Sequence, residues 1–335
     1  MYENLGGGIF GRTRVVRAVL VGLASTIVAC SGRRAGSHDS AVKREKAADL
    51  GAALGNLSTV PLHAPRALSE NSSASMSVRQ AGVFFSINDS GNDALLFALD
   101  TTGADRGNWR VVGASNVDWE ATAVGPCGAA SCVYIGDTGD NDAMRQSRTI
   151  YRVAEPDALA PGKHPTLGQL RAEALTYRYE DNPHDVEAMY VPPNGDIVLI
   201  TKRPVIVRLG HYREALVFRL PSSLWGTTGR AIATLVDSLP IVPGSAPFRL
   251  ITDAALSPDA KHLAVRTYAQ VYIFATDSLT GAIDHAVAPS VCDVTTLSEY
   301  QGEGVSWANN TGRLIFTSEG KKAPLHLADC PLPVG

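Results

Sequence analysis

Short apolar runs separated by turn residues fill this chain of 335 residues from about residue 80 to its end. Residues 133–135, 197–200 and 271–274 are examples of the runs, and residues 193–195 and 309–312 are examples of the turns. Strands this short at this spacing are typical of an all-β sandwich, barrel or propeller. The pattern therefore predicts an all-β fold.

A longer repeat decides among these folds. Five segments begin with an acid, continue with small or apolar residues and a turn, and end in a hydrophobic strand. Their acids are spaced 50, 67, 66 and 50 residues apart and are Glu70, Glu120, Glu187, Asp253 and Glu303. Repeats of about 40–50 residues, lengthened by loop insertions, are typical of propeller blades. The sequence therefore predicts a β-propeller of five blades, with six blades as the alternative.

Each repeat is expected to hold four strands. In the second repeat they are predicted at 120–124, 132–136, 149–153 and 173–179, and in the third at 187–191, 196–201, 214–220 and 231–237. The chain ends at residue 335, so the repeat that starts at Glu303 lacks room for its outer strand. Residues 57–62 are expected to supply that strand and to close the ring.

The first residues have the features of an export signal. Arg12, Arg14 and Arg17 form a basic start, and the apolar run at 15–29 is too short to span a bilayer permanently. The run ends in a small residue before Cys30. This ending resembles the bacterial lipobox, which implies that Cys30 carries lipid, including palmitate, and becomes the mature N-terminus. An ordinary signal peptide with a chance cysteine is the alternative.

These features set the expected domains and location. Residues 1–29 are predicted to be a lipoprotein signal peptide, 30–66 the lipidated cysteine and a tether, and 67–335 the propeller. Ser31 rather than Asp follows the cysteine, which favours the outer membrane of the cell envelope, facing the periplasm or the cell surface. The expected partner is a membrane, through the lipid anchor. The net charge of −3 gives no electrostatic reason to expect nucleic acid.

Four cysteines remain besides the lipidated one. An oxidising compartment is expected to pair Cys127 with Cys132 and Cys292 with Cys330. In the chain-entropy treatment, the longer loop would stabilise the fold by about 4 kcal/mol and the shorter loop by about 2 kcal/mol. Four buried thiols are the alternative. Because the sequence has no CxxC motif, a structural zinc site is not expected.

Propeller geometry predicts where the acids of the repeat meet. The innermost strand of a blade lines the central channel, and the second strand runs antiparallel beside it. The start of the first strand and the end of the second therefore share one mouth of the channel. The starts carry the five acids of the repeat, and the ends carry Asp89, Asp137, Lys202, Arg266 and Glu319. Asp118 and Asp185 each precede a glutamate by two residues.

Such a mouth is expected to hold a cation. Carboxylates crowded in a confined site raise one another's pKa or recruit a cation. Their oxygens suit Ca²⁺ or Mg²⁺ better than zinc. The predicted metal ligands are Glu70, Asp89, Glu120, Asp137, Glu187, Asp253 and Glu303. In the alternative interpretation, the acids bond backbone amides of the next blade and hold the ring together.

The two bases at the mouth suggest a substrate contact. Lys202 and Arg266 would receive an anionic group, with the guanidinium offering a bidentate fork. Alternatively, they pair with Glu187 and Asp253 of their own blades. No catalytic residue can be assigned, because the sequence contains neither a GxSxG elbow nor a P-loop.

An ordered series of short motifs resembles a known family. The series is 88–91 (NDSG), 96–100 (LFALD), 118–120 (DWE), 134–141 (YIGDTGDN), 150–153 (IYRV), 186–188 (VEA), 199–202 (LITK), 255–259 (ALSPD), 266–268 (RTY) and 301–304 (QGEG). It resembles secreted bacterial β-propeller proteins of mostly unknown function, in lipoprotein form, which are distantly similar to phytase-like and esterase-like propellers. The resemblance covers roughly residues 70–320 and implies a propeller fold and export. The paired acidic motifs of calcium-dependent propeller phytases are not recognisable in this sequence.

Two functions follow from these expectations. The first is a binding or scaffold module of the cell envelope, whose acidic channel holds Ca²⁺ and captures a small anionic ligand or an envelope protein. The second is a hydrolase that uses a divalent metal to cleave a phosphate or carboxylate ester. Free bases facing the metal favour the hydrolase, whereas bases held in ion pairs favour the binding module.

Overall fold

The computed structural model describes residues 51–160, 167–202, 206–208, 211–212, 214–241 and 250–335. The predicted signal peptide, Cys30 and most of the predicted tether lie outside the described residues. All described residues belong to one compact unit, 48–335. Its elements are almost all strands, and the part of the chain described here contains no helix long and apolar enough to cross a membrane.

The antiparallel pairings within the described residues form five four-stranded sheets. In order from the inner to the outer strand, the first sheet contains β3 (Ser75–Met76), β4 (Val83–Ser86), β5 (Leu95–Asp100) and β6 (Asp105–Val112). The second contains β7 (Trp119–Cys127), β8 (Ala130–Asp137), β9 (Arg148–Ala154) and β11 (Glu173–Tyr179). The third contains β12 (Val186–Tyr190), β13 (Ile197–Thr201), β16 (Ala215–Leu220) and β17 (Ala231–Leu239).

The last two sheets bring together distant parts of the chain. The fourth contains β18 (Ile251–Leu256), β19 (His262–Thr267), β20 (Gln270–Ala275) and β21 (Ser290–Asp293). The fifth contains β22 (Gly302–Trp307), β23 (Arg313–Ser318), β24 (Leu325–Asp329) and β2 (Gly55–Val60). β2 thus closes the ring beside β24, close to the expected position at 57–62. Because β1 (Ala52–Ala53) and β2 are part of the sheets, strand structure begins before the predicted boundary at residue 67.

Four strands of the described residues lie outside these antiparallel sheets, and two of them pair with outer strands. β10 (Gly168–Arg171) runs parallel to β6, and β1 runs parallel to β21. β11 pairs in parallel with β17, which joins the second and third sheets into one eight-stranded sheet. β14 (Ile206–Arg208) and β15 (His211–Tyr212) form a separate hairpin.

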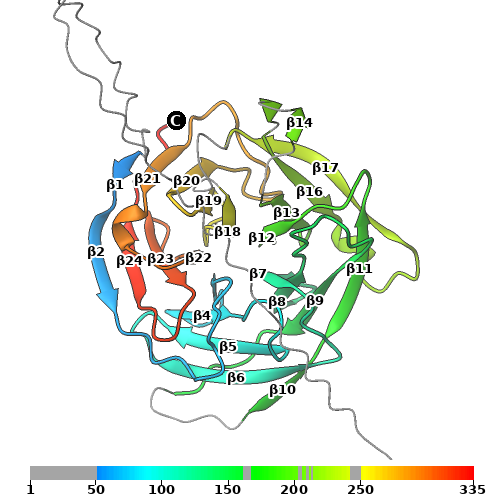
Figure 1. Ribbon diagram of the computed structural model, residues 1–335, viewed down its shortest axis with the longest axis horizontal. Coiled ribbons are helices and arrows are strands. Elements are labelled where there is room, and N and C mark those ends of the chain that lie inside the picture. Colours follow the sequence, from blue (N-terminus) through cyan, green and yellow to red (C-terminus); the bar gives the residue numbers. More distant parts are fainter. Residues whose placement is uncertain (1–50, 161–166, 203–205, 209–210, 213, 242–249) are drawn as a thin grey trace, which may run out of the picture. The chain divides into compact units, whose positions relative to one another are not determined.

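The five inner strands meet around one axis. β7 contacts β3 and β12, β18 contacts β12 and β22, and β22 contacts β3. Figure 1 shows β7, β12, β18 and β22 nearest the centre and the later strands of each sheet farther out. The prediction of an all-β propeller is confirmed. The number of blades stays a prediction, with which the five sheets of the described residues agree.

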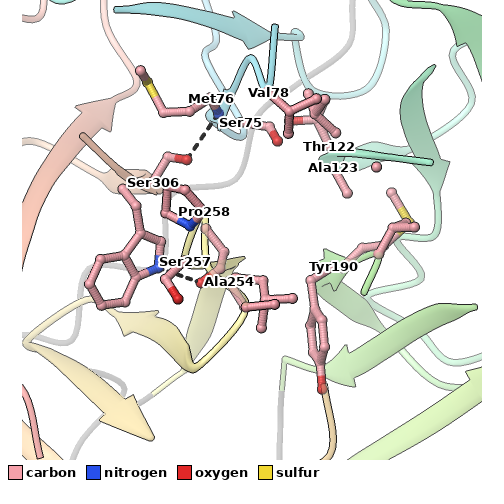
Figure 2. A pocket seen from close by; sticks show the side chains of 18 of the residues that line it. Ser75, Met76, Val78, Thr122, Ala123, Tyr190, Ala254, Ser257, Pro258 and Ser306 are labelled. Carbon is pink, nitrogen blue, oxygen red and sulfur yellow. Dashed lines mark hydrogen bonds between the residues drawn. The ribbon is translucent and has the colours of Figure 1, made fainter. Parts of the chain in front are cut away.

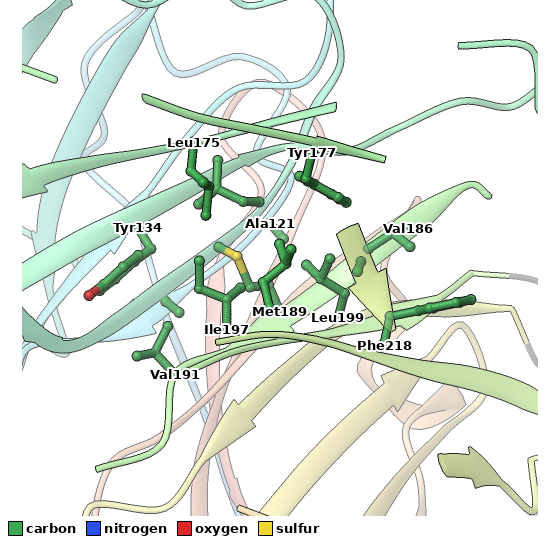
Figure 3. Close-up of a cluster of buried hydrophobic side chains, with 14 of the residues drawn as sticks. Ala121, Tyr134, Leu175, Tyr177, Val186, Met189, Val191, Ile197, Leu199 and Phe218 are labelled. Atoms are coloured by element: carbon green, nitrogen blue, oxygen red, sulfur yellow. The ribbon is translucent and has the colours of Figure 1, made fainter. Parts of the chain in front are cut away.

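The apolar runs of the sequence are strands buried on both faces. All five side chains of β13 are buried, because each sheet is covered by a neighbour on either side. One core cluster packs the second sheet against the third through Tyr134, Leu175, Leu199 and Phe218 (Figure 3). Strands covered on both faces read as continuous apolar runs instead of alternating ones.

Both predicted disulfides are present. Cys127–Cys132 closes the hairpin between β7 and β8, with a Cα–Cα distance of 5.8 Å. Cys292–Cys330 links β21 to the residue after β24, with a Cα–Cα distance of 6.0 Å. The second disulfide therefore ties the fourth sheet to the fifth.

Candidate cation site at the channel mouth

Four inner strands are irregular near their acids. The pairing register shifts between Trp119 and Ala121 in β7, between Val186 and Ala188 in β12, between Ile251 and Asp253 in β18, and between Gly302 and Val305 in β22. Such β-bulges re-aim a side chain and are common beside functional sites. In β7, β12 and β22 the irregular position holds a glutamate, whereas in β18 it holds Thr252.

Three carboxylates meet at the mouth of the channel. Asp89 follows β4, Asp118 precedes β7 and Glu120 lies in β7. One ligand oxygen from each lies within 4.8 Å of the other two. Glu120 is 5% exposed, and its Oε2 accepts a hydrogen bond of 2.9 Å from Ser72 Oγ. We call Asp89, Asp118 and Glu120 the carboxylate triad.

The backbone at Gly139 forms one wall of the triad. A Cβ at this position would lie 2.5 Å from Asp118 Oδ2 and 2.8 Å from Glu120 Oε1. A side chain here would therefore push both carboxylates out of place. Nearby, the buried Asp185 Oδ2 has no hydrogen-bond partner among the described residues, and the charge of Asp185 acts on Asp118. The triad thus has a close-fitting wall and an unsatisfied buried acceptor beside it.

Burial and mutual repulsion change the protonation of the triad. Burial first, and then the charge of Asp89, raise the pKa of Asp118 to about 6. Burial is also the largest cause that raises the pKa of Glu120 well above its usual value, and the charges of Glu187 and Asp89 are the next causes. A bound cation would relieve this repulsion, because it stabilises the ionised carboxylates.

A second polar group lies beside the triad. Lys202 Nζ is 2.5 Å from Glu187 Oε1. Burial raises the pKa of Glu187 to about 8, whereas the charge of Glu187 raises the pKa of Lys202. We take the pair as ionised, because each charge in so close a contact stabilises the other. Glu303 is 3% exposed, and its Oε1 accepts hydrogen bonds from Gln301 Nε2 at 2.6 Å and Tyr268 Oη at 3.3 Å. Its Oε2 has no partner in the described part of the chain, and burial raises its pKa to about 7.

Asp253 does not join the mouth. It is fully buried, and its carboxylate accepts hydrogen bonds from the backbone N–H groups of Ala74, Val305 and Ala254 and from Ser73 Oγ. Ser73 and Ala74 directly precede β3, Ala254 lies in β18 and Val305 lies in β22. Asp253 therefore holds the ring together at its axis, as the alternative interpretation of the acids proposed, and its oxygens are occupied without a cation.

The strand register explains why Asp253 and Glu70 lie away from the triad. Thr252 Oγ1 donates to the carbonyl of Glu303 on the next sheet, and Ser72 Oγ, which donates to Glu120 Oε2, lies 3.3 Å from the carbonyl oxygen of Glu120. Thr252 and Ser72 thus occupy the positions that the repeat assigned to Asp253 and Glu70. Asp253 is one residue from this position, and a shift of one residue turns a strand side chain to the opposite face. Glu70 is two residues from it and precedes β3, which begins at Ser75. Glu70 itself is exposed at the rim, where its Oε2 accepts a hydrogen bond from Asn92 Nδ2 at 2.6 Å.

Two more predicted site residues have partners of their own. Arg266 is fully buried, forms an ion pair with Glu299, and donates to the carbonyls of Gly304 at 2.7 Å and Thr317 at 2.9 Å. It is therefore not placed to receive a substrate. Asp137 pairs with Arg145 at 2.6 Å and accepts the backbone N–H of Asp118 at 3.2 Å. Asp137 thus helps to hold the backbone of Asp118, a member of the triad, in place.

Sequence reasoning missed the charged partners of Asp137 and Arg266. Arg145 and Glu299 were not singled out, because they follow or precede strands in loops that the repeat does not align. Asp118 was noticed beside Glu120 but not assigned as a ligand. Their spacing of two was the available signal, since residues two apart on a strand share one face.

The opposite end of the channel has a different lining. A cavity of about 260 Å³ there is lined by later residues of the inner strands, including Thr122, Tyr190, Ala254 and Ser306 (Figure 2). None of the described residues that line it is charged. The hydrogen bonds of Asp253 lie between this cavity and the acidic mouth along the strands.

No family model and no curated protein sequence matches this chain. Among solved structures, a glutaminyl cyclase from Myxococcus xanthus is 13% identical, with 82% of this chain and 95% of that chain covered and a TM-score of 0.46. A PQQ-bound aldose sugar dehydrogenase from Streptomyces coelicolor is 11% identical, with coverages of 83% and 99% and a TM-score of 0.46. A catalytically inactive virginiamycin B lyase from Staphylococcus aureus is 7% identical, with coverages of 81% and 98% and a TM-score of 0.38. At these values the likenesses carry no argument about function.

Proposed function

We propose that this chain is a lipid-anchored β-propeller of the cell envelope that binds a divalent cation, Ca²⁺ or Mg²⁺, at the carboxylate triad and serves as a binding module. The single observation that supports cation binding is that one carboxylate oxygen each of Asp89, Asp118 and Glu120 lie within 4.8 Å of one another. The ligand atoms are all carboxylate oxygens, which suit hard cations. Water and backbone carbonyls would complete the coordination.

The contacts of the two bases favour binding over ester hydrolysis. The hydrolase alternative needs Lys202 and Arg266 free to hold an anionic ester. Lys202 instead pairs with Glu187, and Arg266 is buried against Glu299. Freeing a base from a buried ion pair would leave an uncompensated carboxylate, which is strongly destabilising. We therefore rank the binding module first.

Cation binding is tested by calorimetric titration of the EDTA-stripped protein with CaCl₂ and with MgCl₂. We expect saturable binding of one ion. Asp118→Asn and Glu120→Gln are expected to weaken it by roughly tenfold or more, because affinity depends on the number of charged ligands. Gly139→Ala should also weaken it, although it removes no ligand, because the added Cβ displaces two carboxylates.

Glu173→Gln is the matched control, because this acid is 65% exposed on β11 and pairs with Arg152. It should leave the affinity unchanged. The affinity should fall between pH 8 and pH 5, because protons compete for Asp118, whose pKa is about 6, and for Glu120. Absence of binding at millimolar Ca²⁺ and Mg²⁺, or equal affinity in the triad variants, would remove the cation from the proposal.

Lipid anchoring has its own test. In a bacterial host fed an alkyne analogue of palmitate, the wild-type chain should be labelled and should sediment with membranes. Cys30→Ser should abolish the label and release the protein from the membrane fraction, because the thiol is the acceptor of the lipid. Ser31→Ala should keep both properties. Label that persists in Cys30→Ser would contradict the anchor.

A further inference from the structure

A second cavity, of about 430 Å³, lies where the ring closes. One wall is the segment at 62–71, which leads from β2, the outer strand of the fifth sheet, to β3, the inner strand of the first. The other wall is the turn between β23 and β24, at 318–323. The cavity therefore spans the junction between the first and the last sheet, and its lining includes no residue of the carboxylate triad.

Three cations line this cavity, namely Arg66, Lys321 and Lys322. None of them takes part in the ion pairs found among the described residues. Among the described residues that line the cavity, none carries a carboxylate. This contrasts with Lys202 and Arg266, whose charges are neutralised inside the fold. Unpaired cations around a concave site favour an anion.

The nearest acids along the chain have partners elsewhere. Glu319 Oε1 accepts a hydrogen bond from Gln301 Nε2 at 2.8 Å. Burial is the largest cause that raises the pKa of Glu319, and the charges of Asp89 and Glu70 raise it as well. Glu70 Oε2 accepts its hydrogen bond from Asn92. Both carboxylates therefore lie with the acids of the mouth and leave the three cations available.

The rest of the lining is mostly apolar. Leu62, Ala64, Pro65, Leu68 and Ala323 contribute to it. Leu68 is 7% exposed and belongs to the core cluster that packs Phe84 and Phe97 of the first sheet against Ile315 and Leu325 of the fifth. The apolar floor is thus anchored in the core, while the cations belong to the exposed rim.

We infer that this cavity binds an amphiphilic anion, with a phosphate or carboxylate group at Arg66, Lys321 and Lys322 and an apolar body over Leu62 and Leu68. The volume lies within the roughly 300–1,000 Å³ of small-molecule sites. Basic side chains supply charge-assisted hydrogen bonds to phosphate or carboxylate oxygens. A lipid or a free amphiphile can present this chemistry. The inference does not depend on the cation at the carboxylate triad.

The test uses the full chain and octyl phosphate below its micelle concentration, with inorganic phosphate and octyl glucoside as partial mimics. Octyl phosphate should bind and raise the melting temperature, because a ligand of the native state stabilises it. Inorganic phosphate and octyl glucoside should each bind at least about tenfold more weakly. Inorganic phosphate lacks the apolar chain, and octyl glucoside lacks the anionic group. Equal binding of octyl phosphate and octyl glucoside would overturn the inference.

The variant Lys321→Ala/Lys322→Gly removes two cations without straining the turn. Lys322 has a φ of 71°, which glycine adopts more readily than lysine. This variant should remain folded and bind octyl phosphate about tenfold or more weakly, because it loses two charge-assisted contacts. Arg230→Ala, at an exposed base outside the cavity, is the control and should bind as the wild type does. Unchanged affinity in the double variant would overturn the site.

Vesicles distinguish the two sources of the ligand. Sedimentation with phosphatidylglycerol vesicles, using Cys30→Ser protein to exclude the lipid anchor, should require Lys321 and Lys322 if the ligand is a membrane lipid. Binding of octyl phosphate without vesicle binding would support a free amphiphile. Vesicle binding that the double variant retains, together with unchanged octyl phosphate binding, would place the interaction elsewhere.

Discussion

Asp253→Ala is expected to lower the free energy of unfolding by about 4 kcal/mol, because it leaves three buried N–H groups without an acceptor, each worth roughly 1–3 kcal/mol. These groups belong to Ala74, Ala254 and Val305, so the loss falls on three sheets at the axis of the ring. The Ser73 hydroxyl, which also bonds Thr122 Oγ1 at 3.0 Å, would lose one partner. Urea unfolding measures the effect.

Asp253→Asn is the conservative comparison. Its carbonyl oxygen can still accept from two donors, and its amide can donate to the Ser73 hydroxyl, so we expect roughly half of the alanine effect. Ca²⁺ affinity in the folded Asp253→Asn protein should match that of the wild type, because the side chain lies outside the carboxylate triad. A loss of Ca²⁺ affinity with nearly unchanged stability would show that Asp253 is a metal ligand.

Removing the Cys292–Cys330 disulfide is expected to destabilise the protein by about 4 kcal/mol, and removing Cys127–Cys132 by about 2 kcal/mol, because the longer loop restricts the unfolded chain more. The sequence separations are 38 and 5 residues. Double substitutions to alanine, compared in urea, measure the two effects. Both cysteines of the long loop are buried, at 0% and 1% exposure, so alanine also leaves small voids that add to the loss.

The two disulfides provide each other's control. The short loop lies within one hairpin of the second sheet, whereas the long loop joins two sheets. The double variant of Cys292 and Cys330 should therefore also expose the C-terminal segment to proteases earlier than the double variant of Cys127 and Cys132. Equal losses from both variants would contradict the loop-length explanation.

Much of the fold was readable from local pattern. The predicted strand at 132–136 lies within β8, and that at 149–153 lies within β9. The closing strand was expected at 57–62 and is β2 at Gly55–Val60. These elements follow from apolar runs, turn residues and the length left after Glu303, all of which act over short stretches of chain.

The candidate site was only partly readable. Glu120, Glu187 and Glu303 were expected at one mouth, and the charge of Glu187 acts on Glu120 while that of Glu303 acts on Glu187. The repeat also selected Asp253 and Glu70, which lie at the axis and at the rim. A bulge has no reliable marker in a single sequence, yet it decides which face a strand residue occupies.

The amino-acid sequence by itself determined that this protein folds as an all-β propeller, where most of its strands lie and how its cysteines pair. Only the tertiary structure decided that Asp118 completes the triad with Asp89 and Glu120, that Asp253 ties sheets together, and that Arg266 is buried against Glu299. The physical reason is the distance along the chain over which each feature is determined. Strands and turns depend on neighbouring residues, whereas the partner of a buried charge depends on register and on loops far away in the chain.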